Sequence, residues 1–173
     1  IGLSYLELNK PEKALKIFLL AVRKIPSDTS IFCNIGNTYN KFGDLKKARE
    51  YFHKALSLNS KHVPSLINLG HLENTLRNTK LATKYYFDAY ELNNNLEDVL
   101  TYTILNHSSN GKFLEAKKII SELNQKFPNN TKSYHLFSKI HKYEIEDPHQ
   151  QIMINKVKEQ NLGYEDLANL FFA

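Results

Sequence analysis

Asparagine side chains recur at one fixed spacing in the first half of this sequence. Three pairs of polar residues stand 34 residues apart, and asparagine fills five of the six positions although it makes up about a tenth of the chain. These residues are Asn34 with Asn68, Asn37 with His71, and Asn40 with Asn74. A primary amide offers both a hydrogen-bond donor and an acceptor, which is the complement of one peptide unit. The pattern predicts either a binding surface for an extended peptide backbone or an ordinary solvated face.

Residue types that support catalysis or metal binding do not converge in the sequence. The seven histidines follow no metal-ligand spacing, and the single cysteine, Cys33, leaves too few thiols for a cysteine-based zinc site or an internal disulfide. His135 and His141 lie nearly opposite each other across a helix, which is typical of solvated residues. The segment Asn110-Gly111-Lys112 resembles part of a phosphate-binding loop but lacks the preceding strand and the earlier glycine. We expect no enzymatic activity, no metal and no cofactor.

The same interval of 34 residues also organises small and aromatic residues. Glycine, alanine and aromatic residues each recur in register, and every unit closes on a turn-forming residue. The columns are Gly2, Gly36 and Gly70; Ala14, Ala48, Ala82 and Ala116; Phe18, Phe52, Tyr86 and Ile120; and Pro26, Ser60, Asn94 and Pro128. Independent columns in one register indicate a structural repeat, in which the small residues mark places where two helix backbones approach closely.

Each repeat reads as two helices joined by a tight turn. Apolar residues follow helical spacing over residues 32–39 and again over residues 45–56. Between these stripes Gly43 can adopt a left-handed conformation and Asp44 can cap the following helix. Pro11 suits the first turn of a helix that runs to about Lys24. The repeat is therefore a helical hairpin.

The order Leu-Gly, Tyr, Ala, aromatic, Ala, Pro at this period resembles the tetratricopeptide repeat (TPR). The second unit matches best, the third has Glu73 where tyrosine belongs, and the fourth replaces the glycine with Ile104 and the tyrosine with His107. The resemblance implies an all-α, right-handed solenoid of stacked antiparallel hairpins. We expect four repeats over residues 1–130, the first truncated, and then a divergent fifth helix pair and the start of a further helix over residues 131–173.

In such an array the first helices of successive hairpins line a concave groove, so the resemblance implies that the six polar residues lie there. Asn34 and Asn68 resemble the asparagine ladder of O-linked N-acetylglucosamine transferases, which breaks here at Tyr102. The carboxylate clamp of co-chaperones also uses asparagines, and Asn37 and Asn68 fall on those positions. Its cationic positions are occupied by Cys33, Asp98 and Tyr102, which removes the charge-assisted bonds that the clamp needs. We therefore predict a non-catalytic scaffold that binds a protein or extended peptide.

The C-terminal residues suggest an alternative. The order of residues 138–143, an acidic turn at Asp147-Pro148, and the apolar end at Leu167, Phe171 and Phe172 resemble the tail of the TPR region in bacterial TPR-linked sulfotransferases. There, a helix leads on towards the catalytic domain, whose phosphosulfate-binding loop is absent from this sequence. This resemblance implies a substrate-recruiting N-terminal arm of a larger transferase.

The amino-acid composition argues against nucleic acids and membranes as partners. The chain has 173 residues and a net charge of +5, and its basic residues are twenty lysines and three arginines. Nucleic-acid readers rely on arginine, so RNA binding is disfavoured, and the longest apolar run is far too short to span a membrane. We expect a cytoplasmic protein whose N-terminus precedes Ile1 and whose chain continues beyond Ala173. Apolar residues at both ends predict self-association through uncapped terminal repeats: Ile1, Leu3 and Leu6, and Leu167, Leu170 and Phe171.

Overall fold

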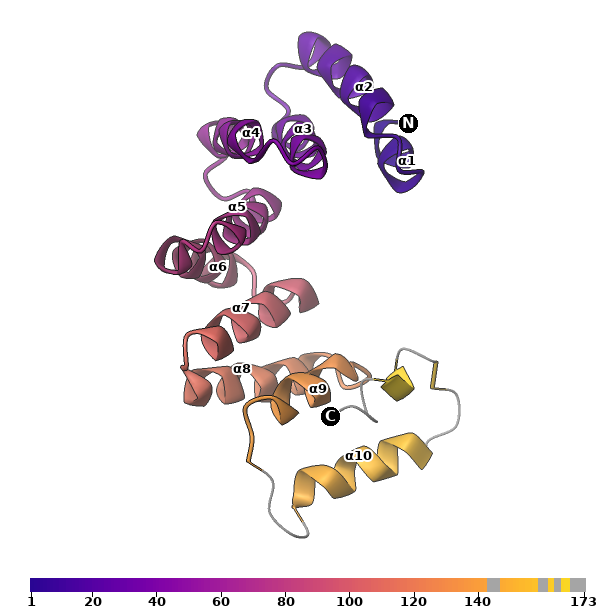
Figure 1. The fold of residues 1–173 in the computed structure, drawn as a ribbon, viewed down its shortest axis with the longest axis vertical. Helices are drawn as coiled ribbons and strands as arrows, with labels where there is room; N and C mark the ends of the chain where they lie inside the picture. The colour runs from indigo at the N-terminus through magenta and orange to yellow at the C-terminus, as the bar shows by residue number, and fades with distance from the viewer. Residues whose placement is uncertain (143–146, 159–161, 164–165, 169–173) are drawn as a thin grey trace. The chain divides into compact units, whose positions relative to one another are not determined.

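The computed structural model describes residues 1–142, 147–158, 162–163 and 166–168, and within these ranges every regular element is a helix (Figure 1). The helices are α1 (Gly2–Glu7), α2 (Pro11–Lys24), α3 (Thr29–Lys41), α4 (Leu45–Leu58), α5 (Val63–Thr75), α6 (Thr79–Leu92), α7 (Glu97–Ser109), α8 (Phe113–Lys126), α9 (Lys132–Ser138) and α10 (Pro148–Lys158). The chain forms two compact units, Ile1–Asn93 and Asn94–Ala173. No helix in the described part is both long enough and apolar enough to cross a membrane.

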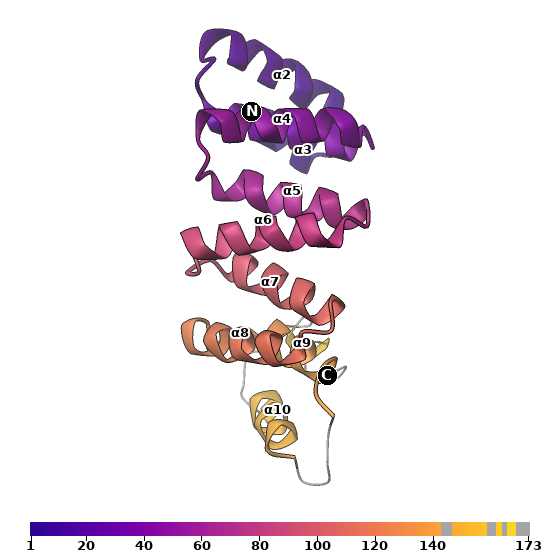
Figure 2. The same ribbon diagram turned by 90° about the vertical axis from the view of Figure 1, so that its left-hand side faces the viewer.

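The N-terminal unit is a stack of three hairpins, α1 with α2, α3 with α4, and α5 with α6. Each hairpin packs on the next, because α2 contacts α3 and α4 contacts α5. The first helices α3 and α5 also contact each other and lie on the same side of α4 and α6 (Figures 1 and 2). This arrangement confirms the predicted all-α class of stacked helix hairpins.

Small residues allow the two helices of each hairpin to meet. A Cβ atom added to Gly36 would lie 2.5 Å from Cε1 of Phe52, and one added to Gly70 would lie 2.6 Å from Cε1 of Tyr86. Gly2 meets Phe18 in the same way, at 2.5 Å. These distances are shorter than any real carbon contact, so the ring occupies the space that a side chain would need. The glycine and aromatic columns of the sequence are therefore a single packing contact, repeated three times.

The turn inside each hairpin uses one residue in the left-handed region. Gly43 has φ 76° and Gly111 has φ 72°, as the glycines in these turns predict. The same position of the other two hairpins holds Asn9, with φ 53°, and Arg77, with φ 60°. Asp44 then caps α4 by accepting a hydrogen bond from the Lys47 backbone N–H at 3.1 Å, which confirms its predicted role. Arg77 carries the steric cost of this conformation without the freedom of glycine.

The C-terminal unit starts with the hairpin of α7 and α8, and α9 packs on both of these helices. The helix predicted to run from Thr131 to about Tyr143 is shorter, because α9 ends at Ser138. The chain turns there, and the backbone N–H of Ile140 bonds to the carbonyl oxygen of Phe137 at 3.0 Å, a tighter step than an α-helix makes. Tyr143 itself lies outside the described residues.

A histidine and an aspartate that precede α10 contact each other. His141 Nε2 lies 2.7 Å from Asp147 Oδ2, and its ring packs on Phe137 with centroids 4.5 Å apart. From α10, Met153 reaches the Tyr134 side chain of α9 and forms a small apolar cluster with it. The division into four repeats over 1–130 and a divergent pair over 131–173 stays a prediction. Of the expected last segment, residues 166–168 are helical.

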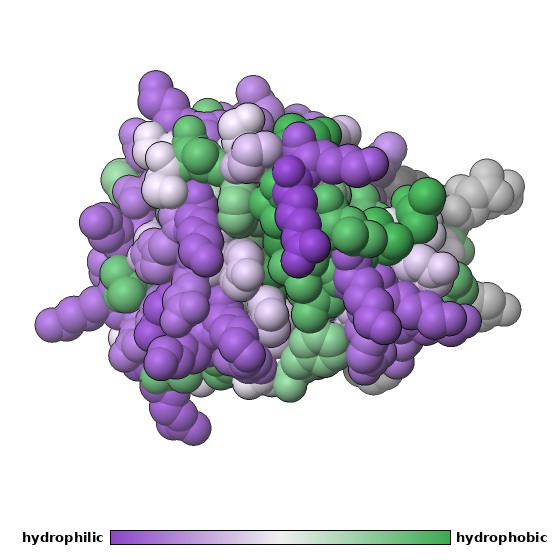
Figure 3. Space-filling view, turned by 90° about the horizontal axis from the view of Figure 1, so that it is seen from above, coloured by the Kyte–Doolittle hydropathy of each residue, from purple (hydrophilic) through white to green (hydrophobic). Residues whose placement is uncertain are grey.

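Apolar side chains are exposed at the N-terminal end of the chain, as the sequence predicts for Ile1 and Leu3. Their exposed fractions are 86% and 54%, whereas Leu6 is half-buried and packs against the cluster of Ala14 and Phe18. Figure 3 looks onto the end where α2 lies and shows hydrophobic surface bordered by hydrophilic side chains. At the other end Leu167 is half-buried, and Leu170, Phe171 and Phe172 lie outside the described residues. Self-association through these ends stays a prediction.

We expect Gly36→Leu to destabilise the N-terminal unit by about 1 to 3 kcal/mol or more, because its side chain must displace the Phe52 ring. Phe52→Ala alone removes a fully buried ring and costs about 3 to 5 kcal/mol. The double variant should be less destabilised than the sum of the two, since each change makes room for the other. Thermal and urea unfolding measure the three values, and strict additivity would show that the two residues do not share one space.

We expect Arg77→Gly to stabilise the chain by up to about 1 kcal/mol, because glycine adopts the observed positive φ without steric cost. Arg77→Ala is the matched control: it removes the same side chain but keeps the Cβ atom that causes the cost. Urea unfolding should therefore rank the glycine variant above the alanine variant. The reverse order would contradict the left-handed conformation of this turn.

Candidate peptide-binding face

The six polar residues singled out in the sequence come from two neighbouring helices of the N-terminal unit. Three lie on α3 and three on α5, at intervals of three residues that keep them on one side of each helix. The two helices touch directly, because the Asn68 Nδ2 atom donates a hydrogen bond to Cys33 Sγ at 3.4 Å. We call this set the asparagine face: Asn34, Asn37, Asn40, Asn68, His71 and Asn74.

The residues of the asparagine face differ in exposure. Asn40 and Asn74 are exposed, whereas the other four members are half-buried. Three hollows in the described part of the chain, of about 470, 490 and 510 Å³, are lined by residues outside the asparagine face. None of these three hollows makes the asparagine face an enclosed small-molecule site.

The amide groups of Asn34 and Asn37 are directed to solvent. Within the described residues neither side chain has a hydrogen-bond partner in the protein, although the main-chain oxygen of Asn34 accepts a bond from Thr38 Oγ1 at 2.7 Å. Both amides keep their donor and acceptor capacity for a ligand. This is the property that the sequence pattern predicts for a surface that holds a peptide backbone.

The side chain of Asn68 is held by a hydrogen bond to Cys33. Its amide nitrogen donates a hydrogen bond to the buried Cys33 sulfur, and its amide oxygen is solvent-accessible and has no hydrogen-bond partner among the described residues. Burial raises the pKa of the Cys33 thiol, while hydrogen bonds from Ser65 and Asn68 act in the opposite direction. The Cys33 thiol is therefore neutral, and its buried position fixes the atom to which Asn68 is bonded. Asn68 is thus oriented to accept a hydrogen bond from a ligand N–H.

His71 has a structural contact as well as a place on the face. Its ring meets the Tyr86 ring edge-on, with centroids 5.7 Å apart, and Nδ1 lies 3.3 Å from the Tyr86 hydroxyl. Tyr86 is the aromatic residue that fills the space over Gly70. A change at His71 would therefore disturb the hairpin as well as the face.

Glu73 is a buried residue that sequence reasoning recorded only as a missing tyrosine. The side chain is 1% exposed; its Oε1 accepts a hydrogen bond from Arg49 Nε at 2.7 Å and its Oε2 accepts one from Asn78 Nδ2 at 2.8 Å. This ion pair ties α5, which carries half of the asparagine face, to α4. The 34-residue repeat could have predicted this ion pair. Glu73 stands at the position that Tyr39 occupies in the preceding repeat, and a carboxylate buried there needs a cationic partner.

The histidines of the C-terminal unit are less exposed than the sequence predicts. His141 was expected on a solvated surface, but it is half-buried, with Nδ1 3.1 Å from Lys117 Nζ and Nε2 next to Asp147. His149 packs its ring on Phe137 with centroids 4.3 Å apart, and burial lowers its pKa. Among the described residues no group of histidine, cysteine and acidic side chains is arranged to hold a metal ion.

The sequence and the hairpin geometry agree with one known family. The family model of the tetratricopeptide repeat matches residues 30–62, which span α3, α4 and the turns that flank them. This chain contains a tetratricopeptide repeat. Tetratricopeptide repeat proteins 8 and 21A of Mus musculus are 27% identical over 62 residues and 33% identical over 61 residues. These matches cover 36% and 35% of this chain. They cover only 12% and 5% of the lengths of the two relatives.

Solved TPR structures share the fold over nearly the whole chain. PilF of Pseudomonas aeruginosa is 19% identical with a TM-score of 0.80, and the match covers 97% of this chain and 77% of PilF. YrrB, described as a TPR protein with an unusual peptide-binding site, is 20% identical with a TM-score of 0.69, covering 96% and 87%. MamA of Desulfovibrio magneticus is 15% identical with a TM-score of 0.68, covering 98% and 89%. At these identities the likeness establishes the fold alone.

We expect Arg49→Met to destabilise the TPR stack by about 1 to 3 kcal/mol, because it leaves the Glu73 carboxylate buried without its cation. The double variant Arg49→Met with Glu73→Leu should recover much of the loss, since it buries no charge. Lys47→Met is the control on the same helix: its pair with Asp44 is open to solvent, so its loss should change stability much less than the loss of Arg49 does. Urea denaturation that finds the double variant less stable than Arg49→Met would contradict this account.

Proposed function

We propose that the asparagine face binds an extended segment of a partner protein mainly through that segment's backbone. TPR proteins are protein-interaction scaffolds, which sets the general role of this chain. The observation that supports the finer proposal is the pair of solvent-directed amides, Asn34 and Asn37, beside the oriented amide of Asn68. Together they offer donors and an acceptor on one surface, at a spacing set by two touching helices.

The absence of charge on the asparagine face supports recognition of the backbone. On α1, α3 and α5 the acidic and basic residues other than histidine are Glu7, Lys41 and Glu73, and Glu73 is buried in its ion pair. An uncharged face provides no strong attraction for acidic or basic side chains of a ligand. A ligand is then held by neutral hydrogen bonds, so its affinity should depend little on salt.

The alternative role as the recruiting arm of a sulfotransferase-like enzyme rests on residues at the C-terminal end. Phe171 and Phe172 lie outside the described residues, and the helix expected over residues 131–143 ends at Ser138. These observations give the transferase arm no support beyond the sequence resemblance. The relatives are TPR scaffold proteins, a class that is generally not enzymatic, and we propose a non-catalytic role without metal or cofactor.

Replacing both Asn34 and Asn68 with alanine should weaken ligand binding by roughly tenfold to a few hundredfold. Each neutral hydrogen bond to the ligand contributes on the order of 1 kcal/mol, and loss of the bond from Asn68 to Cys33 should lower the stability of the fold by a similar amount, about 1 kcal/mol. The ligand is a peptide selected against the intact chain from a displayed random library. Isothermal titration calorimetry measures its affinity, and circular dichroism checks folding.

The control for this experiment is Asn59→Ala, a change at an exposed asparagine in the turn after α4, away from the asparagine face. It should leave affinity unchanged. If the double variant binds the selected peptides as tightly as the parent chain does, the asparagine face is a solvated surface and the proposal is wrong.

A further inference from the structure

Positive charge is distributed unevenly along this chain. Residues 1–93 contain fourteen Lys and Arg against eight Asp and Glu, a net charge of +6, while residues 94–173 contain nine against ten, a net charge of −1. The whole basic excess of the protein therefore belongs to the N-terminal unit. Neither the TPR repeat nor the asparagine face needs this charge.

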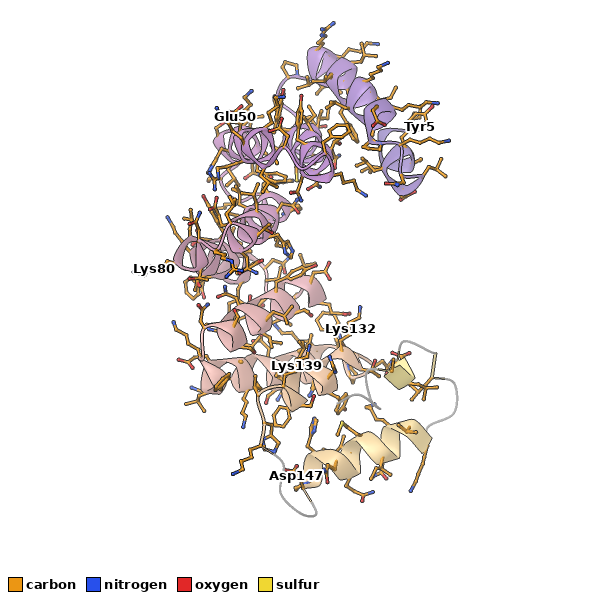
Figure 4. All side chains as sticks on the ribbon, viewed as in Figure 1. Tyr5, Glu50, Lys80, Lys132, Lys139 and Asp147 are labelled. Carbon is orange, nitrogen blue, oxygen red and sulfur yellow. The ribbon has the colours of Figure 1, made fainter. Side chains whose placement is uncertain are left out.

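Within the N-terminal unit the basic residues lie on the second helices of the hairpins. We call the exposed basic side chains of α2, α4 and α6 the lysine face. They are Lys13, Lys16, Arg23, Lys24, Lys46, Lys47, Lys54, Lys80 and Lys84. Figure 4 shows Lys80 on α6 and Glu50 on α4 directed away from α3 and α5. The lysine face thus lies on different helices from the asparagine face.

The three helices of the lysine face are neighbours. Tyr51 of α4 packs against the apolar cluster that α2 forms with Ala14 and Phe18. Tyr85 of α6 lies next to His53 of α4, with ring centroids 6.4 Å apart. The basic side chains therefore belong to one surface and can act on one partner together.

We propose that the lysine face is a second interaction surface, which binds an acidic segment of a partner protein independently of the asparagine face. Its charges are mixed, because Glu12, Glu50, Asp88 and Glu91 lie on the same helices. An acidic protein segment can place its carboxylates opposite lysines and avoid the acidic positions. A uniformly anionic surface such as a lipid bilayer meets those four carboxylates as well, and like charges repel.

The residue types also favour a protein over a nucleic acid. Two of the basic residues on these helices are arginines, and one of them, Arg49, is engaged by Glu73. Two of the aromatic rings on these helices are engaged within the fold: Tyr51 stacks on Tyr39 with centroids 5.4 Å apart, and Tyr85 packs against the core, whereas Phe87 of α6 is exposed. With eight lysines and one arginine, the lysine face lacks the set of guanidinium forks with which proteins read bases.

The test uses the intact chain and a fluorescein-labelled poly-glutamate peptide at several salt concentrations. In the main variant Lys16, Lys46, Lys80 and Lys84, which are exposed and form no ion pair in the described structure, are replaced with glutamine. Because each exposed charge pair contributes only modestly, fluorescence anisotropy should show that loss of all four lowers affinity by at least about fourfold. Replacing the same four residues with arginine keeps the charge and should keep the binding.

The matched control replaces four exposed lysines of the C-terminal unit with glutamine: Lys112, Lys118, Lys142 and Lys158. It lowers the net charge equally, and we expect less than about a twofold change in affinity. An equal loss from both sets would show that only net charge matters, which overturns the proposal. So would tighter binding, at the same salt, to phosphatidylserine vesicles or single-stranded RNA than to poly-glutamate. The Asn34→Ala, Asn68→Ala double variant should bind poly-glutamate normally, which separates this surface from the asparagine face.

Discussion

The close contact between a glycine of one helix and an aromatic ring of its partner is the constraint on which this structure depends. It recurs at Gly2, Gly36 and Gly70, and in each hairpin the ring fills the space of the missing side chain. Because the ring is rigid and buried, it fixes both the distance and the rotation of the two helices. The fixed rotation of the two helices then determines which of the other side chains face the core and which face solvent.

This rotation explains why the N-terminal unit has two chemically different surfaces. Once the glycine side of a first helix is buried, its opposite side carries amides, of which Asn40 and Asn74 are exposed and Asn34 and Asn68 are half-buried. The second helices bury their alanine and aromatic columns and expose lysines instead. A repeat protein stabilised by contacts between neighbours leaves such surfaces free to vary, and here one became neutral and the other basic.

The third hairpin shows how a departure from the repeat is accommodated. Glu73 replaces an aromatic residue at a position that remains buried, and desolvating a carboxylate is unfavourable without partners. Arg49 from the preceding hairpin and Asn78 from the next turn supply those partners. The substitution thereby adds a polar link between α4 and α5. It also limits the freedom of Arg49 to contact a ligand.

The sequence alone determined the helical hairpins, the shared register of their small and aromatic residues, and the turn at Gly43, because these follow from local spacing within one 34-residue period; that the ring fills the space over the glycine came from the structure. It did not reveal the end of α9 at Ser138, the burial of His141 or the ion pair of Glu73. Each of these depends on a partner from another element, Asp147, Lys117 or Arg49, and a periodic pattern carries no information about single contacts between repeats. Only the tertiary structure decided them, since the cost of burying a charged or polar group depends on what lies opposite it.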